Sequence, residues 1–342
     1  MPLTAAYEGE AIMGCSELIT GIFPHHMTAE CAQTQPTDRL KLTVIAGTNK
    51  EGKDFMPIDF RQVTKTYDDG TAAVQKFSLH IPSHTATVLL GSSGCGKTTL
   101  LRMVNRMVDP TSGSVLIDDE DVARAAPVAL RRRIGYVMQN AGLLPHRKVI
   151  DNIATVPRLN GVSRGAAKRR AYELMEIVGL DYTLALKYPG QLSGGQQQRV
   201  GVARALAADP NILLMDEPFG AVDPLVRIEL QRELKRIQTE LRKTIIFVTH
   251  DVDEALTLGD QIVVLKKGAE VAQVGTPQEI VENPADQFVA QFLGLDSQRR
   301  TLSARPRAGG GWFISDARGK PLGVVDQAPS DQAPIDRAPE TD

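Results

Sequence analysis

The chain has 342 residues, of which 42% are hydrophobic and 23% charged, so it is long enough for one large domain or two modest ones. Lys and Arg number 39 against 41 Asp and Glu, so no overall positive field draws it to nucleic acid, and we expect no nucleic-acid partner. Three scattered cysteines exclude a disulfide framework, and no apolar run reaches the roughly 20 residues of a membrane-spanning helix.

The two ends of the chain differ in composition from its middle. Residues 1–55 show no sustained strand or helix period, and Met56 directly precedes the first clear strand pattern, residues 58–63. We therefore expect residues 1–55 to be a disordered leader or the result of a wrongly assigned start codon. Residues 297–342 predict a tail in which residues 312–325 form a small hairpin and the Pro-, Asp- and Ala-rich end is disordered.

Between these ends, strand and helix patterns alternate. Continuous apolar runs at residues 87–90, 212–215 and 244–248 predict strands that are buried on both faces. Amphipathic stretches at residues 167–178 and 226–241 predict helices. The expected architecture is an α/β fold with a parallel sheet wrapped by helices.

A glycine-rich loop follows the predicted strand at residues 87–90. It consists of Gly91, Ser92, Ser93, Gly94, Cys95, Gly96, Lys97, Thr98 and Thr99. Its spacing matches G-x-x-x-x-G-K-[ST], a P-loop, in which backbone N–H groups and a helix N-terminus surround phosphate oxygens. Lys97 can reach the β- and γ-phosphates, and the Thr98 hydroxyl is placed to ligate Mg²⁺. The alternative is a glycine-rich turn with a surface lysine.

The predicted strand at residues 212–215 ends in two acids, Asp216 and Glu217. Asp216 can hold the hydration shell of Mg²⁺, while Glu217 polarises the attacking water. Paired acids at a strand end can also merely cap the next helix. With a P-loop in the same chain, we expect ATP and Mg²⁺ as cofactors.

Residues 192–200 identify the class of protein. Leu192, Ser193, Gly194, Gly195 and Gln196, followed by Gln-Gln-Arg-Val, resemble the signature sequence of ATP-binding-cassette (ABC) ATPases. The resemblance covers about residues 57–296. It implies a P-loop NTPase cassette at residues 56–296, with a RecA-like parallel-sheet core, an N-terminal antiparallel β-subdomain and a helical subdomain at about residues 140–205 that carries the signature.

The resemblance also implies roles for single residues. Tyr67 stands where the family stacks an aromatic ring on adenine, and Gln139 and Asp223 match the Q-loop and the D-loop. His250 matches the switch histidine. With Glu217, Gln139 and His250 would be catalytic, and Gln139 would also contact Mg²⁺. Taken alone, Tyr67 could be a half-buried strand residue, Gln139 a loop amide and His250 a polar residue at a strand end.

Ser193 and two glycines before a helix form a second anion-binding helix start. In the family the two anion sites of one chain do not meet. The resemblance therefore implies a homodimer in which one copy contacts the ATP held by the P-loop of the other. The residues that contact ATP from the second copy would be Ser193, Gly194, Gly195, Gln196 and Asp223.

Within the family, residues 101–113 and 151–159 look like the importers of osmoprotectants such as glycine betaine, choline and carnitine. This implies transmembrane permease subunits, an extracytoplasmic solute-binding protein, and a place at the cytoplasmic face of the plasma membrane through the permease. Importers use a stretch like residues 140–146 to grip a membrane subunit, although it could be an ordinary surface loop.

Two other functions stay open at this point. The chain could drive an importer for another small solute, such as an amino acid or methionine, or it could be a soluble ABC ATPase outside transport. Residues 312–325 resemble the opening fragment of a cystathionine-synthase-like regulatory domain.

Overall fold

The computed structural model describes residues 56–220, 222–295, 303–307, 310–315 and 321–326. The expectations for residues 1–55, for the turn of the C-terminal hairpin and for the end of the tail lie outside these ranges. In the described parts, no helix combines the length and apolar character that crossing a bilayer requires.

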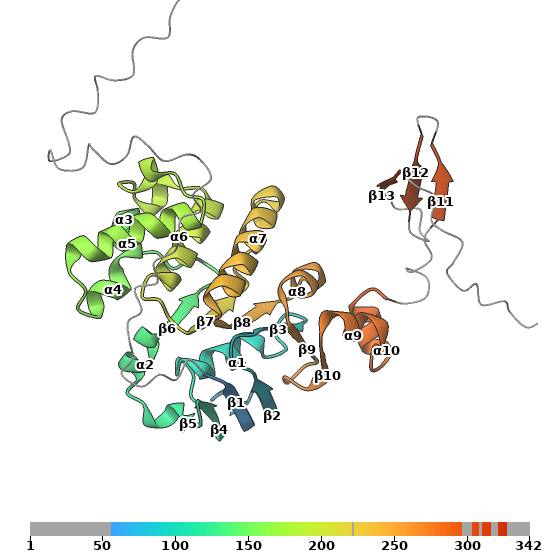
Figure 1. Cartoon of the computed structure of the whole chain (residues 1–342). Coiled ribbons are helices and arrows are strands. Elements are labelled where there is room, and N and C mark those ends of the chain that lie inside the picture. Colours follow the sequence, from blue (N-terminus) through green and yellow to red (C-terminus); the bar gives the residue numbers. More distant parts are fainter. Residues whose placement is uncertain (1–55, 221, 296–302, 308–309, 316–320, 327–342) are drawn as a thin grey trace, which may run out of the picture. The chain divides into compact units, whose positions relative to one another are not determined.

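A six-stranded sheet of order β10-β9-β3-β8-β7-β6 forms the centre of the cassette (Figure 1). Its strands are β3 (Ala86–Gly91), β6 (Ile134–Val137), β7 (Ile212–Asp216), β8 (Thr244–Thr249), β9 (Gln261–Leu265) and β10 (Val271–Gly275). All neighbours pair in parallel except β10, which is antiparallel to β9. Every residue of β3, β7 and β8 is buried, which explains their continuous apolar runs and confirms the predicted parallel sheet.

A second sheet, of order β2-β1-β4-β5, is antiparallel throughout. Its strands are β1 (Ile58–Thr66), β2 (Ala72–Ile81), β4 (Ser112–Ile117) and β5 (Glu120–Asp121). The rings of Phe60 and Phe77 meet edge to face, 5.2 Å between centroids, in a hydrophobic core that also contains Leu100 and Leu101 of helix α1 and Leu89 of β3. The expected N-terminal antiparallel β-subdomain is confirmed.

The helices fall into groups by the strands they connect (Figure 1). Helix α1 (Lys97–Val104) follows β3, and α2 (Pro127–Arg133) precedes β6. The chain between β6 and β7 forms α3 (Val149–Ile153), α4 (Thr155–Leu159), α5 (Arg164–Ile177) and α6 (Gly194–Leu206). The remaining helices are α7 (Pro224–Leu241), α8 (Val252–Leu258), α9 (Pro277–Glu282) and α10 (Gln287–Phe292). Within the described residues, short 3₁₀ turns lie at 122–124, 182–184 and 189–191.

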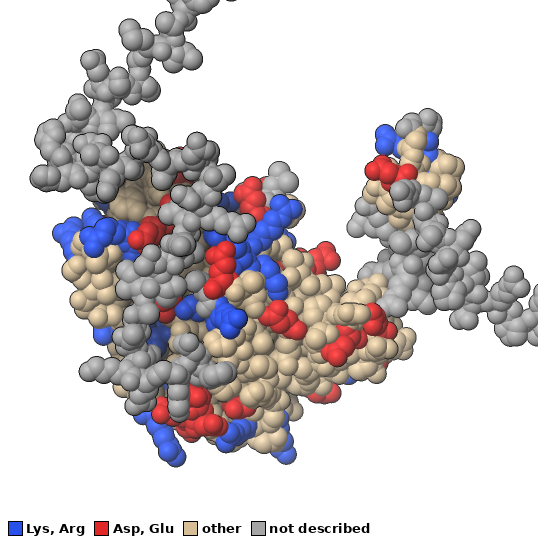
Figure 2. Space-filling view, viewed as in Figure 1, with Lys and Arg blue, Asp and Glu red and all other residues tan. Residues whose placement is uncertain are grey.

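The helices α3 to α6 pack on one another through a second core that includes Ile150, Ala171, Leu174 and Val200. Helix α5 begins three residues before the predicted start, because the hydroxyl of Ser163 accepts a hydrogen bond from the backbone N–H of Ala166 and caps the helix. Figure 2 shows Lys and Arg side chains interspersed with Asp and Glu over the face in view.

The C-terminal described residues form a three-stranded antiparallel sheet of order β11-β12-β13. Its strands are β11 (Ser303–Pro306), β12 (Trp312–Ser315) and β13 (Pro321–Val325). The two strands expected at residues 312–325 are present, and β11 is an addition. Its four residues, Ser-Ala-Arg-Pro, are too few and too mixed in character to show a strand period.

Candidate functional site

The loop between β3 and α1 has the backbone shape of a phosphate cradle. Gly94 and Gly96 adopt φ angles of 76° and 113°, which L side chains rarely adopt. A Cβ on Gly96 would lie 2.5 Å from the carbonyl oxygen of Ala73, so glycine is required there. Gly96 has no side chain to cap α1, and the first N–H groups of a helix have no acceptor within it. These N–H groups can therefore bind an anion.

Lys97 begins α1 and is buried, with 4% of its surface exposed. Its ammonium donates hydrogen bonds to the carbonyl oxygens of Gly91 at 2.7 Å and Ser92 at 2.8 Å. The Lys97 side chain thus lies along the same loop that would bind the phosphates. Cys95 is also buried, so its thiol faces the interior, where it lies 3.8 Å from the Lys97 ammonium. Only the backbone of Cys95 is placed to meet a ligand.

Thr98 and Asp216 meet although they are 118 residues apart in the sequence. The Thr98 hydroxyl donates a 2.8 Å hydrogen bond to Oδ1 of Asp216, the last residue of β7. Burial raises the pKa of Asp216, and the bond from Thr98 and the positive charge of Arg102 oppose this. A hydroxyl and a carboxylate are oxygen ligands of the kind that Mg²⁺ prefers, so this pair fits that ion.

Sequence analysis missed two side chains beside Asp216. The hydroxyl of Tyr136 donates to Oδ2 of Asp216 over 3.4 Å, and the guanidinium of Arg102 lies 3.9 Å from the same oxygen. Arg102 stands four residues after Thr98 on α1, so the helical period alone places both side chains on one face. Nothing in the sequence around Tyr136 indicates its contact, because Tyr136 and Asp216 become neighbours only through the pairing of β6 with β7.

Glu217 lies between Gln139 and His250. The Gln139 side-chain amide donates a 3.1 Å hydrogen bond to Oε2 of Glu217, and Nδ1 of His250 lies 3.3 Å from Oε1. Glu217 has a φ of 44°, a left-handed conformation that is rare for residues other than glycine, and its N–H donates to the carbonyl of Val248. Strained backbone of this kind concentrates at functional sites. The structure thus brings all three predicted catalytic residues together.

Tyr67 lies beside the first turn of α1. Its hydroxyl is 3.4 Å from the hydroxyl of Thr99, and the ammonium of Lys65 lies 5.3 Å from the centre of its ring. The side chain is 40% exposed, so much of Tyr67 is accessible to a ligand next to the phosphate cradle. An exposed aromatic face can stack on a nucleobase.

The signature residues form the start of α6, not part of the phosphate cradle. The Ser193 hydroxyl accepts from the N–H of Gln196 at 3.2 Å, and the Gln196 side chain accepts from the N–H of Ser193 at 3.0 Å, which is a capping box. Gly194 and Gly195 form the first turn of the helix. Helices α6 and α1 lie apart (Figure 1), so the two helix starts that the sequence predicts to bind anions are separate within one chain.

Asp223 immediately precedes α7, and its carbonyl oxygen accepts a hydrogen bond from the N–H of Arg227. The Arg227 guanidinium lies 3.5 Å from Asp251 and 3.8 Å from Glu254. Since Asp251 follows His250, Arg227 joins the start of α7 to the chain that carries His250. Burial raises the pKa of Glu254, and the hydrogen bond donated by Thr249 opposes this. Sequence analysis missed this cluster, because its members lie on different elements.

Comparison with known proteins agrees with these motifs. The family model described as ABC transporter matches residues 74–220, a range that contains the phosphate cradle, Gln139, the signature and both acids, but not Tyr67, Asp223 or His250. The chain is 50% identical over 249 residues to the carnitine transport ATP-binding protein OpuCA of Listeria monocytogenes. That match covers 73% of this chain and 62% of OpuCA, so the chain spans less than two thirds of this relative's length.

A second relative is covered more fully. The chain is 49% identical to the glycine betaine uptake system ATP-binding protein YehX of Escherichia coli, over 69% of this chain and 76% of YehX. A solved dimeric ATP-binding cassette bound to ADP and Pi superposes with a TM-score of 0.61 and 34% identity, over 64% of this chain and 98% of that one. From its motifs, its fold and these matches, the chain belongs to the ABC transporter family of ATP-binding proteins.

Proposed function

We propose that this chain is an ATPase that powers the import of a small solute through a separate membrane permease. The position of Glu217 is the observation that carries the proposal. Glu217 directly follows Asp216, which bonds Thr98, and it lies within hydrogen-bonding distance of Gln139 and His250. Phosphoryl transfer to water needs positioned charge and an oriented nucleophile more than covalent chemistry, and this cluster offers both.

The residues divide the work as follows. The P-loop N–H groups and Lys97 would bind the phosphates, and Thr98 and Asp216 would hold Mg²⁺ with help from Gln139. Held by these residues, Mg²⁺ would supply positive charge that offsets the negative charge of the phosphates. Glu217 would accept a proton from the attacking water, and His250 would contact the γ-phosphate. Tyr67 would stack on the adenine.

The signature would complete the site from a second copy of the chain. Ser193, Gly194, Gly195 and Gln196 begin α6, away from the P-loop of their own chain. The N–H groups of Ser193 and Gln196 bond within the capping box, so the N–H groups of Gly194 and Gly195 would be the ones that meet a phosphate. Asp223, exposed before α7, would join them at the interface. The dimeric form of the solved cassette supports a homodimer. In that dimer, ATP would lie between the two copies.

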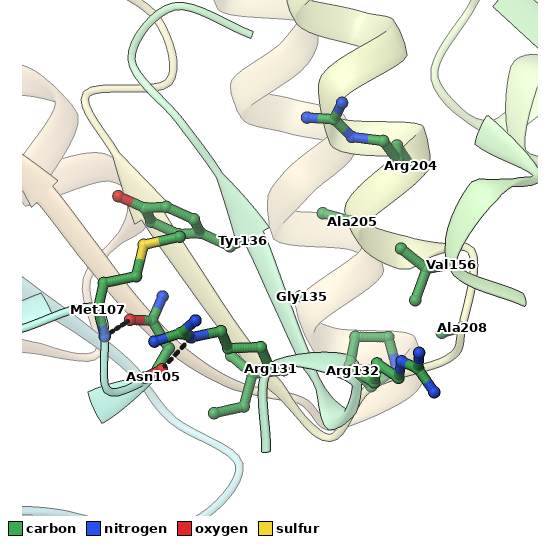
Figure 3. Close-up of a pocket in the computed structure, with 12 residues that line it drawn as sticks. Asn105, Met107, Arg131, Arg132, Gly135, Tyr136, Val156, Arg204, Ala205 and Ala208 are labelled. Carbon is green, nitrogen blue, oxygen red and sulfur yellow. Dashed lines mark hydrogen bonds between the residues drawn. The ribbon is translucent and has the colours of Figure 1, made fainter. Parts of the chain in front are cut away.

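The permease would dock near the boundary between the central sheet and the helical subdomain, residues 140–205. A cavity of about 160 Å³ lies there, lined by residues such as Met107 after α1, Arg131 on α2, Tyr136 on β6, Val156 on α4 and Arg204 on α6 (Figure 3). Residues 140–146, which we expect to contact the membrane subunit, lie close to this cavity, because Arg204 also bonds the carbonyls of Ala141 and Gly142. Docked in this way, the chain would lie at the cytoplasmic face of the plasma membrane.

The solute would be an osmoprotectant with a quaternary amine, such as carnitine, glycine betaine or choline, delivered by an extracytoplasmic binding protein. Relatives named for carnitine, glycine betaine and choline transport, all at least 49% identical to this chain, support this assignment.

Two measurements test the proposal. The chain should hydrolyse Mg·ATP, and Glu217→Gln should lower the rate by about 10²- to 10⁴-fold while ATP binding survives. Assembled in liposomes with an osmoprotectant permease and its binding protein, the chain should have its ATPase activity stimulated by quaternary amines and not by methionine. Stimulation by amino acids alone would contradict the osmoprotectant assignment, and full activity of Glu217→Gln would contradict the proposed chemistry.

A further inference from the structure

One face of α6 holds the segment that carries Gln139. The side-chain amide of Gln198 donates to the carbonyl of Met138 over 3.4 Å. One turn later, α6 comes close enough to Ala141 that a Cβ on Gly201 would lie 3.5 Å from it. After another turn, Arg204 donates 2.7 Å hydrogen bonds to the carbonyls of Ala141 and Gly142. Residues at intervals of three share a helix face, so residues 138–142 follow α6 along its length.

The Arg204 contact is the strongest of the three. Its two bonds are short and charge-assisted, and a guanidinium presents its donors in a fixed fork that suits two adjacent acceptors. Gly142 has a φ of 55°, a left-handed backbone conformation that favours glycine at this bend. Figure 3 shows Arg204 on α6, at the border of the cavity between α6 and β6. Arg204 thus fixes where residues 141 and 142 lie relative to α6.

Each end of α6 lies at residues that take part in the proposed ATPase mechanism or adjoin such residues. Its N-terminus carries Ser193 and the signature, and its 13 residues span about 20 Å as a rigid rod. Its C-terminal part holds residues 141 and 142, two and three residues after Gln139. Gln139 in turn bonds Glu217. A displacement of α6 at its signature end therefore reaches Glu217 through Arg204 and Gln139.

We propose that Arg204 is a positioning residue that transmits the position of the signature helix to the Gln139–Glu217 pair of its own chain. Closure of the signature on ATP held by the partner copy then sets the geometry of hydrolysis in the copy that owns α6. The inference rests on the proposed ATPase function and on its dimeric site. Through Arg204, nucleotide binding at one site of the dimer would be coupled to the position of Glu217 in the other site.

Arg199 provides a matched control on the same helix. Its guanidinium also donates to two successive carbonyl oxygens, those of Val178 and Gly179, and it lies 3.0 Å from Glu229 on α7. Arg199→Met therefore removes an equivalent set of bonds from α6 without touching residues 138–142. A difference between Arg199→Met and Arg204→Met cannot come from loosening α6 in general.

The test is hydrogen exchange of the full chain with and without Mg·ATP, in the Glu217→Gln background that holds ATP unhydrolysed. In the Glu217→Gln chain, with or without Arg199→Met, ATP should slow amide exchange in both residues 193–200 and residues 138–142. In Arg204→Met, only residues 193–200 should be protected. With Glu217 intact, Arg204→Met should lower kcat about tenfold with KM changed less than about twofold. Arg204→Lys keeps the charge but lacks the guanidinium fork, so it should recover only part of the rate.

The outcomes separate this inference from the proposed function. Equal protection of residues 138–142 in Arg204→Met, or the same loss in Arg199→Met, overturns the role of Arg204 while the ATPase stands. If ATP fails to protect residues 193–200 even with Arg204 present, the shared site is wrong and the inference falls with it. Should Arg204→Met not fold, Arg204→Lys must still show partial loss at residues 138–142, and full protection there overturns the proposal.

Discussion

The Thr98 hydroxyl donates a 2.8 Å hydrogen bond to Asp216 Oδ1, which joins the start of α1 to the end of β7. Asp216 is buried, with 3% of its surface exposed, so its carboxylate has few other partners from solvent. The bond holds the carboxylate oxygen next to the hydroxyl, and both atoms are suited to a Mg²⁺ shell. In the proposed site, Mg²⁺ affinity should therefore depend on the Thr98 hydroxyl as well as on the Asp216 carboxylate.

Replacing Thr98 by Val keeps its shape and removes the hydroxyl. We expect Thr98→Val to raise the Mg²⁺ concentration for half-maximal ATPase activity about tenfold, equivalent to about 1.4 kcal/mol. Thr98→Ser retains the hydroxyl and should stay within about twofold of the natural chain. The measurement is ATPase rate against free Mg²⁺, with thermal melting to check the fold. An unchanged Mg²⁺ dependence in Thr98→Val would remove Thr98 from the metal site.

Two substitutions of Tyr67 distinguish what its ring and its hydroxyl each contribute to ATP binding. Its hydroxyl reaches Thr99 over 3.4 Å at an exposed site, a weak contact, so Tyr67→Phe should bind ATP within about twofold of the natural chain. Tyr67→Ala loses the ring, and stacking is worth about 1–3 kcal/mol, so its Kd for ATP should rise at least about fivefold. Calorimetric titration in the Glu217→Gln background measures both. Similar losses in Phe and Ala variants would rule out stacking.

We expect the buried carboxyl of Glu254 to make the free energy of unfolding depend on pH. Burial raises the pKa of Glu254 above its ordinary value of 4.5, so folding favours its neutral form. The contribution of Glu254 to the free energy of unfolding is fully present below pH 4.5, the ordinary pKa of the group. This contribution is lost as the pH rises through the raised pKa, with a slope of at most about 1.4 kcal/mol per pH unit. Glu254→Gln, which cannot ionise, should lose less stability than the natural chain between pH 5 and pH 8.

Urea unfolding at the two pH values measures this difference. The control is Glu282→Gln, which removes an exposed carboxyl and should leave the pH dependence unchanged. If Glu254→Gln and the natural chain lose the same stability between pH 5 and pH 8, the carboxyl of Glu254 does not carry the effect.

The phosphate cradle could be predicted from the sequence because its parts are contiguous. The glycines whose φ angles shape the loop, the lysine and the threonine lie within nine residues, so spacing alone describes the motif. The parallel sheet was equally readable, since strands buried on both faces must be apolar throughout.

The cluster around Glu217 depends on strand order, which the sequence does not display. Strands β6, β7 and β8 are neighbours, and Gln139, Glu217 and His250 follow their carboxyl ends by one or two residues. Residue types could not reveal this convergence, and the family resemblance supplied Gln139 and His250 instead. Arg204 and Arg227 were missed because long side chains that bridge separate elements leave no local spacing pattern.

In the proposed dimer, Lys97 of one copy and Ser193 of the other contact the same nucleotide. Lys97→Ala damages the phosphate cradle and Ser193→Arg blocks the signature, so each variant alone should be nearly inactive. A mixed dimer pairs the intact cradle of one variant with the intact signature of the other. Mixing equal amounts should therefore restore about a quarter of the natural ATPase rate. A mixture no more active than its separate components would contradict the shared site.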